Sequence, residues 1–103
     1  MALKKTNAFR SRKLLDLAKG RACVECGLQD ETVVGAHYSG LFAAEFGKGR
    51  GIKPHDWLVA WLCWSCHEAF DSYKGGNGTE RSAFFFRAVC RTLAILFEEG
   101  HIK

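Results

Sequence analysis

The stretch LCWSCH (Leu62–His67) decides the fold that we predict, because it ends an apolar segment and carries two cysteines, Cys63 and Cys66, at Cys-x-x-Cys spacing. A second pair with the same spacing, Cys23 and Cys26, lies earlier in the chain. This spacing lets both thiolates of a pair bind one ion, and two pairs supply the four sulfur ligands of a tetrahedral zinc site. We therefore predict one structural Zn²⁺ held by all four cysteines.

Buried free thiols and a redox-active thiol pair are the alternative interpretations of these cysteines. The fifth cysteine, Cys90, has no partner at ligand spacing, and we expect it to be a small core residue of the last helix. The first residues are polar, without the apolar core of a secretory signal, and no apolar run is long enough to span a membrane. We therefore expect a cytoplasmic protein, in a reducing compartment where cysteines bind metals.

Length and charge suggest one domain with affinity for phosphates. The chain has 103 residues, 48% of them hydrophobic, which predicts a single domain (1–103) with a modest core that a bound metal would support. The net charge is +4, with basic residues gathered near the start and in a glycine-rich segment. Such clusters attract DNA, although an ordinary solvated surface explains them equally well. The predicted DNA-contacting side chains are Arg10, Arg12, Lys13, Lys48, Arg50 and Lys53.

Hydrophobic spacing around the cysteine pairs predicts a small α+β arrangement. The expected elements are a helix over 8–18, a strand from 32 to about 37, a strand over 56–62, a helix over 65–73 and a helix over 79–99. They divide the domain into a basic N-terminal helix (1–20), a core with two zinc knuckles, two strands and a helix (21–74), and a C-terminal helix (79–100). The stripe of the last helix that we expect to be buried comprises Phe85, Val89, Leu93, Leu96 and Phe97.

Three further residues predict a second site. His67 begins a helix and Asp71 is four residues later, so the imidazole and the carboxylate share one helical face and form a two-ligand platform for a divalent metal. His37 ends the first predicted strand and is expected to face this platform. The arrangement suits phosphodiester hydrolysis, in which a neutral imidazole takes a proton from the attacking water. Each residue also has a structural interpretation, as a strand-end histidine, a partner of the zinc cysteines or an exposed acid.

The sequence resembles a known family in three segments. These are Ala36-His37, GRGIKPHD (Gly49–Asp56) and LCWSCH (Leu62–His67), and they resemble the HNH nuclease signature. The likeness is closer to the YbcO-like nucleases of phages and prophages, looser to the Ref-type HNH nucleases, and it covers most of the chain from about Arg10. The resemblance implies a zinc-stabilised ββα-metal fold (HNH, or His-Me finger) with flanking N- and C-terminal helices.

The resemblance also implies roles for single residues. His37 matches the general base, and His67 matches a ligand of a catalytic Mg²⁺ or Mn²⁺. Asp71 stands where many members place a further histidine ligand. Asp56 lies near the middle position, usually asparagine, which orients the catalytic loop; a loop-capping role after a proline is the alternative. Ala36 departs from the pattern, because many members have another metal ligand there.

Two functions from different classes follow. The first is a metal-dependent DNA endonuclease or nickase, with DNA as substrate and phage or host recombination or replication proteins as further partners. The second is a non-catalytic zinc module of phage origin that binds DNA or protein, which Ala36 and Asp56 favour. A thiol redox protein is a third interpretation, and about one tightly held zinc per chain would count against it.

Overall fold

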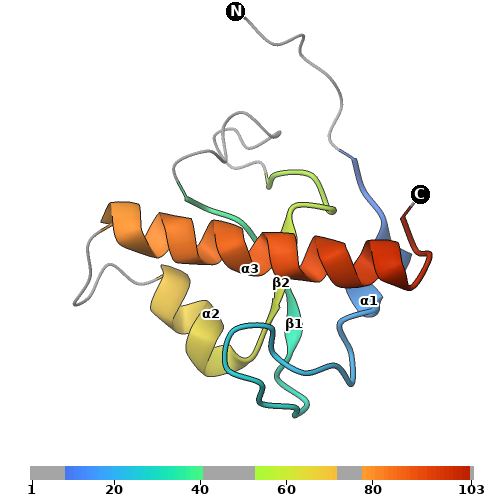
Figure 1. Cartoon of the computed structure of the whole chain (residues 1–103), viewed down its shortest axis with the longest axis horizontal. Helices are drawn as coiled ribbons and strands as arrows, with labels where there is room; N and C mark the ends of the chain where they lie inside the picture. Colours follow the sequence, from blue (N-terminus) through green and yellow to red (C-terminus); the bar gives the residue numbers. More distant parts are fainter. Residues whose placement is uncertain (1–8, 41–52, 72–77, 103) are drawn as a thin grey trace, which may run out of the picture.

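The computed structural model describes residues 9–40, 53–71 and 78–102 and has a small α+β fold built on a two-stranded antiparallel sheet (Figure 1). In chain order the elements are α1 (Arg12–Asp16), β1 (Val34–His37), β2 (Val59–Leu62), α2 (Trp64–Asp71) and α3 (Gly78–Glu98). The predicted class and order of elements are therefore confirmed. None of these helices is both long and apolar enough to cross a lipid bilayer.

The sheet pairs the two strands in one register, with Val34 opposite Leu62 and His37 opposite Val59. β1 thus ends at His37, as predicted, and β2 ends directly before the second cysteine pair. The predicted loop residues 41–52 and the predicted end of the α2 helix at 72–73 lie outside the described residues.

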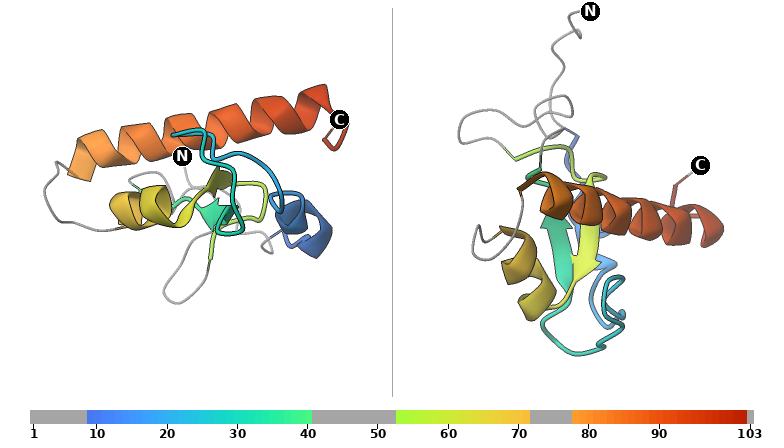
Figure 2. Two further views of the ribbon diagram at one scale, coloured as in Figure 1. Left: turned by 90° about the horizontal axis from the view of Figure 1, so that it is seen from below. Right: turned by 60° about the vertical axis from the view of Figure 1, so that its left-hand side comes forward.

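Helices lie on both faces of the sheet. α3 forms an outer layer that runs across one face (Figures 1 and 2). The Tyr38 ring, just past β1, packs edge-on against Phe85 of α3 with ring centroids 5.3 Å apart. On the opposite face α1 lies so close to Gly35 that an added Cβ would be 3.4 Å from Leu15 Cδ2. α2 joins the same core through Phe70, whose ring stacks on Phe85 at 5.1 Å.

The buried side of α3 differs from the prediction at two positions. Phe85, Val89 and Leu96 are buried as predicted, but Phe97 is 55% exposed, and Cys90, predicted to be in the core, is also exposed. The reason is helical phase, because residues seven apart lie on the same side of a helix. Cys90 and Phe97 are seven apart and share the outer side, so both predictions were wrong.

The outer edge of β2 is closed by two other segments. The backbone N–H of Val24, in the first cysteine knuckle, donates to the carbonyl of Trp61 at 2.9 Å. The backbone N–H of Trp61 donates to Thr92 Oγ1 on α3 at 3.0 Å, and the Thr92 hydroxyl donates in turn to the Ala88 carbonyl at 3.2 Å. The knuckle and α3 thereby satisfy backbone groups that a two-stranded sheet leaves open.

The N-terminal helix is shorter than predicted. Ser11 is extended and its Oγ accepts the Leu14 N–H at 3.1 Å, so α1 begins at Arg12 and not at residue 8, which lies outside the described residues. Its inner side is as predicted, because Leu14 and Ala18 are buried. The residues just before Ser11 form contacts with the segment that precedes β2 instead of a helical turn.

Candidate functional site

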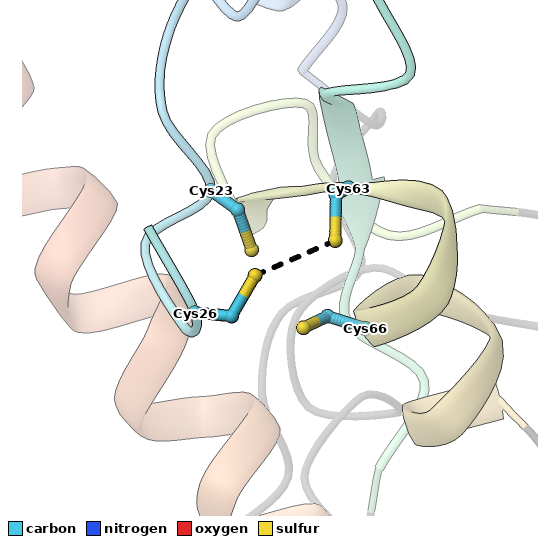
Figure 3. Close-up of side chains that lie close together, drawn as sticks. All are labelled: Cys23, Cys26, Cys63 and Cys66. Atoms are coloured by element: carbon cyan, nitrogen blue, oxygen red, sulfur yellow. Dashed lines mark hydrogen bonds between the residues drawn. The ribbon is translucent and has the colours of Figure 1, made fainter. Parts of the chain in front are cut away.

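The four cysteines of the two pairs come together as predicted. Their sulfur atoms all lie within 4.8 Å of one another, and Figure 3 shows them pointing toward a common centre. The Sγ atoms of Cys26 and Cys63 are 3.7 Å apart. In a tetrahedral site with Zn–S bonds of about 2.3 Å, neighbouring sulfurs are about 3.8 Å apart. The donor set and its spacing therefore fit one zinc ion.

Local backbone structure positions each pair. In the first knuckle the Gly27 N–H donates to the Cys23 carbonyl at 2.9 Å, and Gly27 has a φ of 85°, a conformation that glycine adopts most easily. In the second pair the His67 N–H donates to the Cys63 carbonyl at 2.9 Å, so that Cys63 and Cys66 flank the first turn of α2. One pair thus lies on a turn and the other on a helix start, and the sheet holds them face to face.

The protonation of the thiols is uneven. Burial by itself raises the pKa of Cys23, but backbone N–H groups of Cys26 and Cys63 bind its sulfur and lower the pKa to about 7. Burial and the neighbouring thiols raise the pKa of Cys66 well above its ordinary value. The thiolate of Cys23 therefore forms readily, whereas the thiol of Cys66 resists deprotonation, because a second negative charge needs a cation beside it. Binding of a divalent ion would release the remaining protons.

A second cluster joins the end of β1 to the segment before β2. His37 Nε2 lies 2.8 Å from Asp56 Oδ1, and the two side chains are only 16% and 6% exposed. Burial raises the pKa of Asp56, but the hydrogen bonds from His37 and the Ser11 N–H and the charges of His37 and Arg10 outweigh it and lower the pKa overall. An ionised carboxylate only accepts, so a neutral His37 carries its proton on Nε2 and has a free lone pair on Nδ1.

A third contact set ties α2 to the end of β1. His67 Nε2 and Asp71 Oδ2 are 2.9 Å apart on one face of the helix, with side chains 36% and 47% exposed. The hydroxyl of Ser39, two residues after His37, donates to the other oxygen of Asp71 at 3.1 Å. Ser39 was not among the predicted site residues, because a lone serine in a loop carries no pattern that distinguishes it.

The predicted histidines and acids form two pairs. Within the ranges 9–40, 53–71 and 78–102, the four cysteines are the one set of three or more His, Cys, Asp or Glu residues whose ligand atoms gather around a common point. His37 contacts Asp56, whereas His67 contacts Asp71. The role of His37 as general base and the roles of His67 and Asp71 as metal ligands stay predictions.

The predicted DNA-contacting residues have different surroundings. Arg12 and Lys13 on α1 and Lys53 before β2 are exposed, while Lys48 and Arg50 lie outside the described residues. Arg10 is also exposed, with 45% of its side chain accessible, but its guanidinium is bonded within the protein, because it donates to the carbonyls of Pro54 and Lys53 at 2.6 Å and 2.8 Å. No local sequence signal predicted these contacts, which join residues more than forty positions apart.

Comparisons with known proteins agree with this architecture. The profile of the family described as "Putative nuclease YbcO" matches residues 12–101. A solved structure, "Structure of a putative bacteriophage protein from Escherichia coli str. K-12 substr. MG1655", is similar with a TM-score of 0.59 and 26% sequence identity. The similarity covers 84% of this chain and 99% of that chain. No curated protein matches the chain.

Proposed function

Since the chain belongs to the family described as "Putative nuclease YbcO", we propose that it is a cytoplasmic, metal-dependent DNA endonuclease or nickase with a zinc-stabilised ββα-metal (HNH-type) site. His37 is the general base, Asp56 orients it, and His67 and Asp71 hold Mg²⁺ or Mn²⁺. The observation that carries the proposal is the 2.8 Å contact between His37 Nε2 and the buried carboxylate of Asp56.

The His37–Asp56 pair has the chemistry of a general base. Asp56 fixes the ring through Nε2, so that Nδ1 is the atom that takes a proton from water. The carboxylate also stabilises the imidazolium that results, as charge partners do in other catalytic pairs. Because His37 retains 16% of its side-chain exposure, the ring is not sealed from solvent.

The His67–Asp71 pair is the proposed metal platform. Both side chains are accessible and lie one helical turn apart, and the ion would replace their mutual hydrogen bond. Two protein ligands suit a metal that keeps most of its waters, as Mg²⁺ does. When bound, the metal supplies positive charge that stabilises the phosphate and the departing 3′ oxygen. Ser39, bonded to Asp71, holds this platform next to the end of β1.

The phosphate backbone of DNA would bind to the exposed cations. The accessible ones are Arg12, Lys13 and Lys53. We include Lys48 and Arg50 as further contacts, because they belong to the same glycine-rich segment as Lys53. Counterion release then makes DNA affinity fall with salt. Phage or host replication and recombination proteins are the further partners that fit an enzyme of this kind.

A plasmid-nicking assay tests the proposal. The zinc-loaded protein is incubated with supercoiled DNA and Mg²⁺ or Mn²⁺, and wild type is compared with His37→Ala. We expect the substitution to reduce the cleavage rate by about 10²- to 10⁴-fold, the usual contribution of a general base. His101→Ala is the matched control, because His101 lies past the end of α3 and contacts Glu99. Equal rates for wild type and His37→Ala would contradict the proposal.

A non-catalytic zinc module that binds DNA or protein is the second candidate. It is favoured by Ala36, whose methyl side chain offers no ligand to a metal, and by the two separate pairs that His37 and His67 form. This candidate predicts salt-dependent DNA binding that His37→Ala leaves unchanged. A metal-dependent cut that disappears in His37→Ala would exclude it.

A further inference from the structure

The segment just before α1 is bonded closely to the segment that carries Asp56. The Asp56 N–H donates to the Phe9 carbonyl at 2.9 Å, and the Ser11 N–H donates to Asp56 Oδ2 at 2.7 Å. Arg10, between Phe9 and Ser11, directs its Nη1 to Asp56 Oδ1 at 3.3 Å. Asp56 is therefore fixed through its backbone and both carboxylate oxygens by three consecutive residues.

We propose that Arg10 is a positioning residue for the Asp56–His37 pair and not a contact to the DNA phosphates, an inference that rests on the proposed function. Its Nη1 donates a hydrogen bond to the Pro54 carbonyl at 2.6 Å, and its Nη2 donates one to the Lys53 carbonyl at 2.8 Å. Both terminal nitrogens are thus engaged within the protein. The planar fork of arginine is suited to binding several acceptors at fixed angles, which lysine cannot do.

Arg10 and His37 contact the same carboxylate oxygen. Asp56 Oδ1 lies 2.8 Å from His37 Nε2 and 3.3 Å from Arg10 Nη1. The positive guanidinium competes with the imidazolium form of His37 for the negative charge of Asp56. Arg10 therefore holds the carboxylate in place for the ring, and its positive charge offsets part of the negative charge that Asp56 presents to His37.

Other titratable groups adjoin this pair from two directions. His55 is next to Asp56, and its Nδ1 accepts the Phe9 N–H at 2.8 Å while its ring stacks on Trp57. From α2, Asp71 reaches the end of β1 through Ser39, with His67 bonded behind it. Neither His55 nor Asp71 has a hydrogen bond or ion pair to Asp56 among the described residues. Substitutions at Arg10 and Asp56 therefore change the surroundings of the His37–Asp56 pair without removing a direct contact of His55 or Asp71 with Asp56.

Two substitutions that should shift the titration midpoint of His37 in opposite directions give the sharpest test. Arg10→Gln removes the positive charge beside Asp56, so the imidazolium is stabilised and the midpoint of the His37 ring titration moves to higher pH. Asp56→Asn removes the negative charge, so the midpoint moves to lower pH. Both are measured by NMR on the full zinc-loaded chain, with the His37 signals assigned by their loss in His37→Gln. Arg12→Gln, an exposed arginine on α1, is the matched control and leaves the midpoint unchanged.

Cleavage kinetics separate positioning from DNA binding. We expect Arg10→Gln to lower kcat by about 10- to 100-fold, the scale of a displaced catalytic group, with KM and the salt slope of DNA binding unchanged. The acid limb of its pH–rate profile moves to higher pH, and Arg10→Lys does not restore kcat. Circular dichroism and thermal melting confirm that each variant is folded.

The outcomes are distinguishable. A raised KM and a salt slope reduced by about one for Arg10→Gln, with an unchanged His37 titration, would make Arg10 a phosphate contact and overturn the inference. Absence of cleavage by the wild-type protein would overturn the proposed function alone. The two His37 titrations would then still decide whether Arg10 positions the pair.

Discussion

The guanidinium of Arg21 and the carboxylate of Glu99 form a two-bond ion pair, with Nη1–Oε2 and Nη2–Oε1 distances of 2.7 Å and 2.6 Å. Arg21 lies two residues before Cys23 of the first cysteine knuckle, and Glu99 directly follows the end of α3. The guanidinium also lies over the ring of Trp61, 5.0 Å from its centroid. This pair joins the first cysteine knuckle, β2 and the C-terminal end of α3 at one point.

The pH dependence of this ion pair is the first prediction. Arg21 lowers the pKa of Glu99 from its ordinary value of 4.5 to about 2, mainly by hydrogen bonding. A carboxyl group with a lowered pKa in the folded state contributes stability above its unfolded pKa and loses it as the pH falls. Glu99→Gln should therefore lower the urea midpoint above pH 4.5, with the difference shrinking as the pH falls toward about 2. Glu98→Gln is the neighbouring control, and an equal loss there would contradict the prediction.

Thr92 should contribute through its hydroxyl oxygen. Replacing Thr92 by valine keeps the shape but leaves the buried Trp61 N–H without its acceptor, which lies 3.0 Å away. An unsatisfied buried donor costs about 1–3 kcal/mol, so the free energy of unfolding should fall by that amount. Thr92→Ser keeps the oxygen and serves as the control. Chemical denaturation of the two variants makes the comparison, and an equal loss in both would assign the effect to packing.

Substitution of a cysteine ligand should remove both the bound zinc and the cooperative folding of the protein. Cys66→Ala removes one of four ligands, whereas Cys90→Ala alters an exposed residue on α3. Zinc binding in small domains is worth about 10–16 kcal/mol, as large as the whole stability of a typical domain. We expect Cys66→Ala to lose its zinc and its cooperative melting transition, and Cys90→Ala to retain both. Elemental analysis and circular dichroism measure the two properties.

Thiol labelling distinguishes the ligands from the fifth cysteine. In the zinc-loaded protein the four ligand thiolates are held by the ion, so a thiol reagent should modify Cys90 rapidly and the others slowly. After addition of a chelator all five cysteines of the chain should react. Rapid labelling of Cys23 or Cys26 before chelation, located by mass spectrometry, would argue against a stable zinc site.

The sequence predicted the features that depend on local spacing. The two cysteine pairs have ligand spacing within four residues, and the β-branched run at 32–34 indicates the strand that ends at His37. Cys90 and Phe97 were misplaced, because both residue types are usually buried and the phase of α3 depends on what it packs against. The contacts of Asp56 could not be predicted, since they join it to residues 19 and 46 positions away.

The hydrogen bond between the Val24 N–H and the Trp61 carbonyl links the cysteine cluster to the edge of β2. Val24 lies between two ligands, so loss of the ion should loosen the knuckle and expose this edge of β2. A free strand edge is a template for pairing with another chain. Metal depletion should therefore end in insoluble aggregates that grow by strand addition, and chelators in a purification buffer would remove the protein from solution.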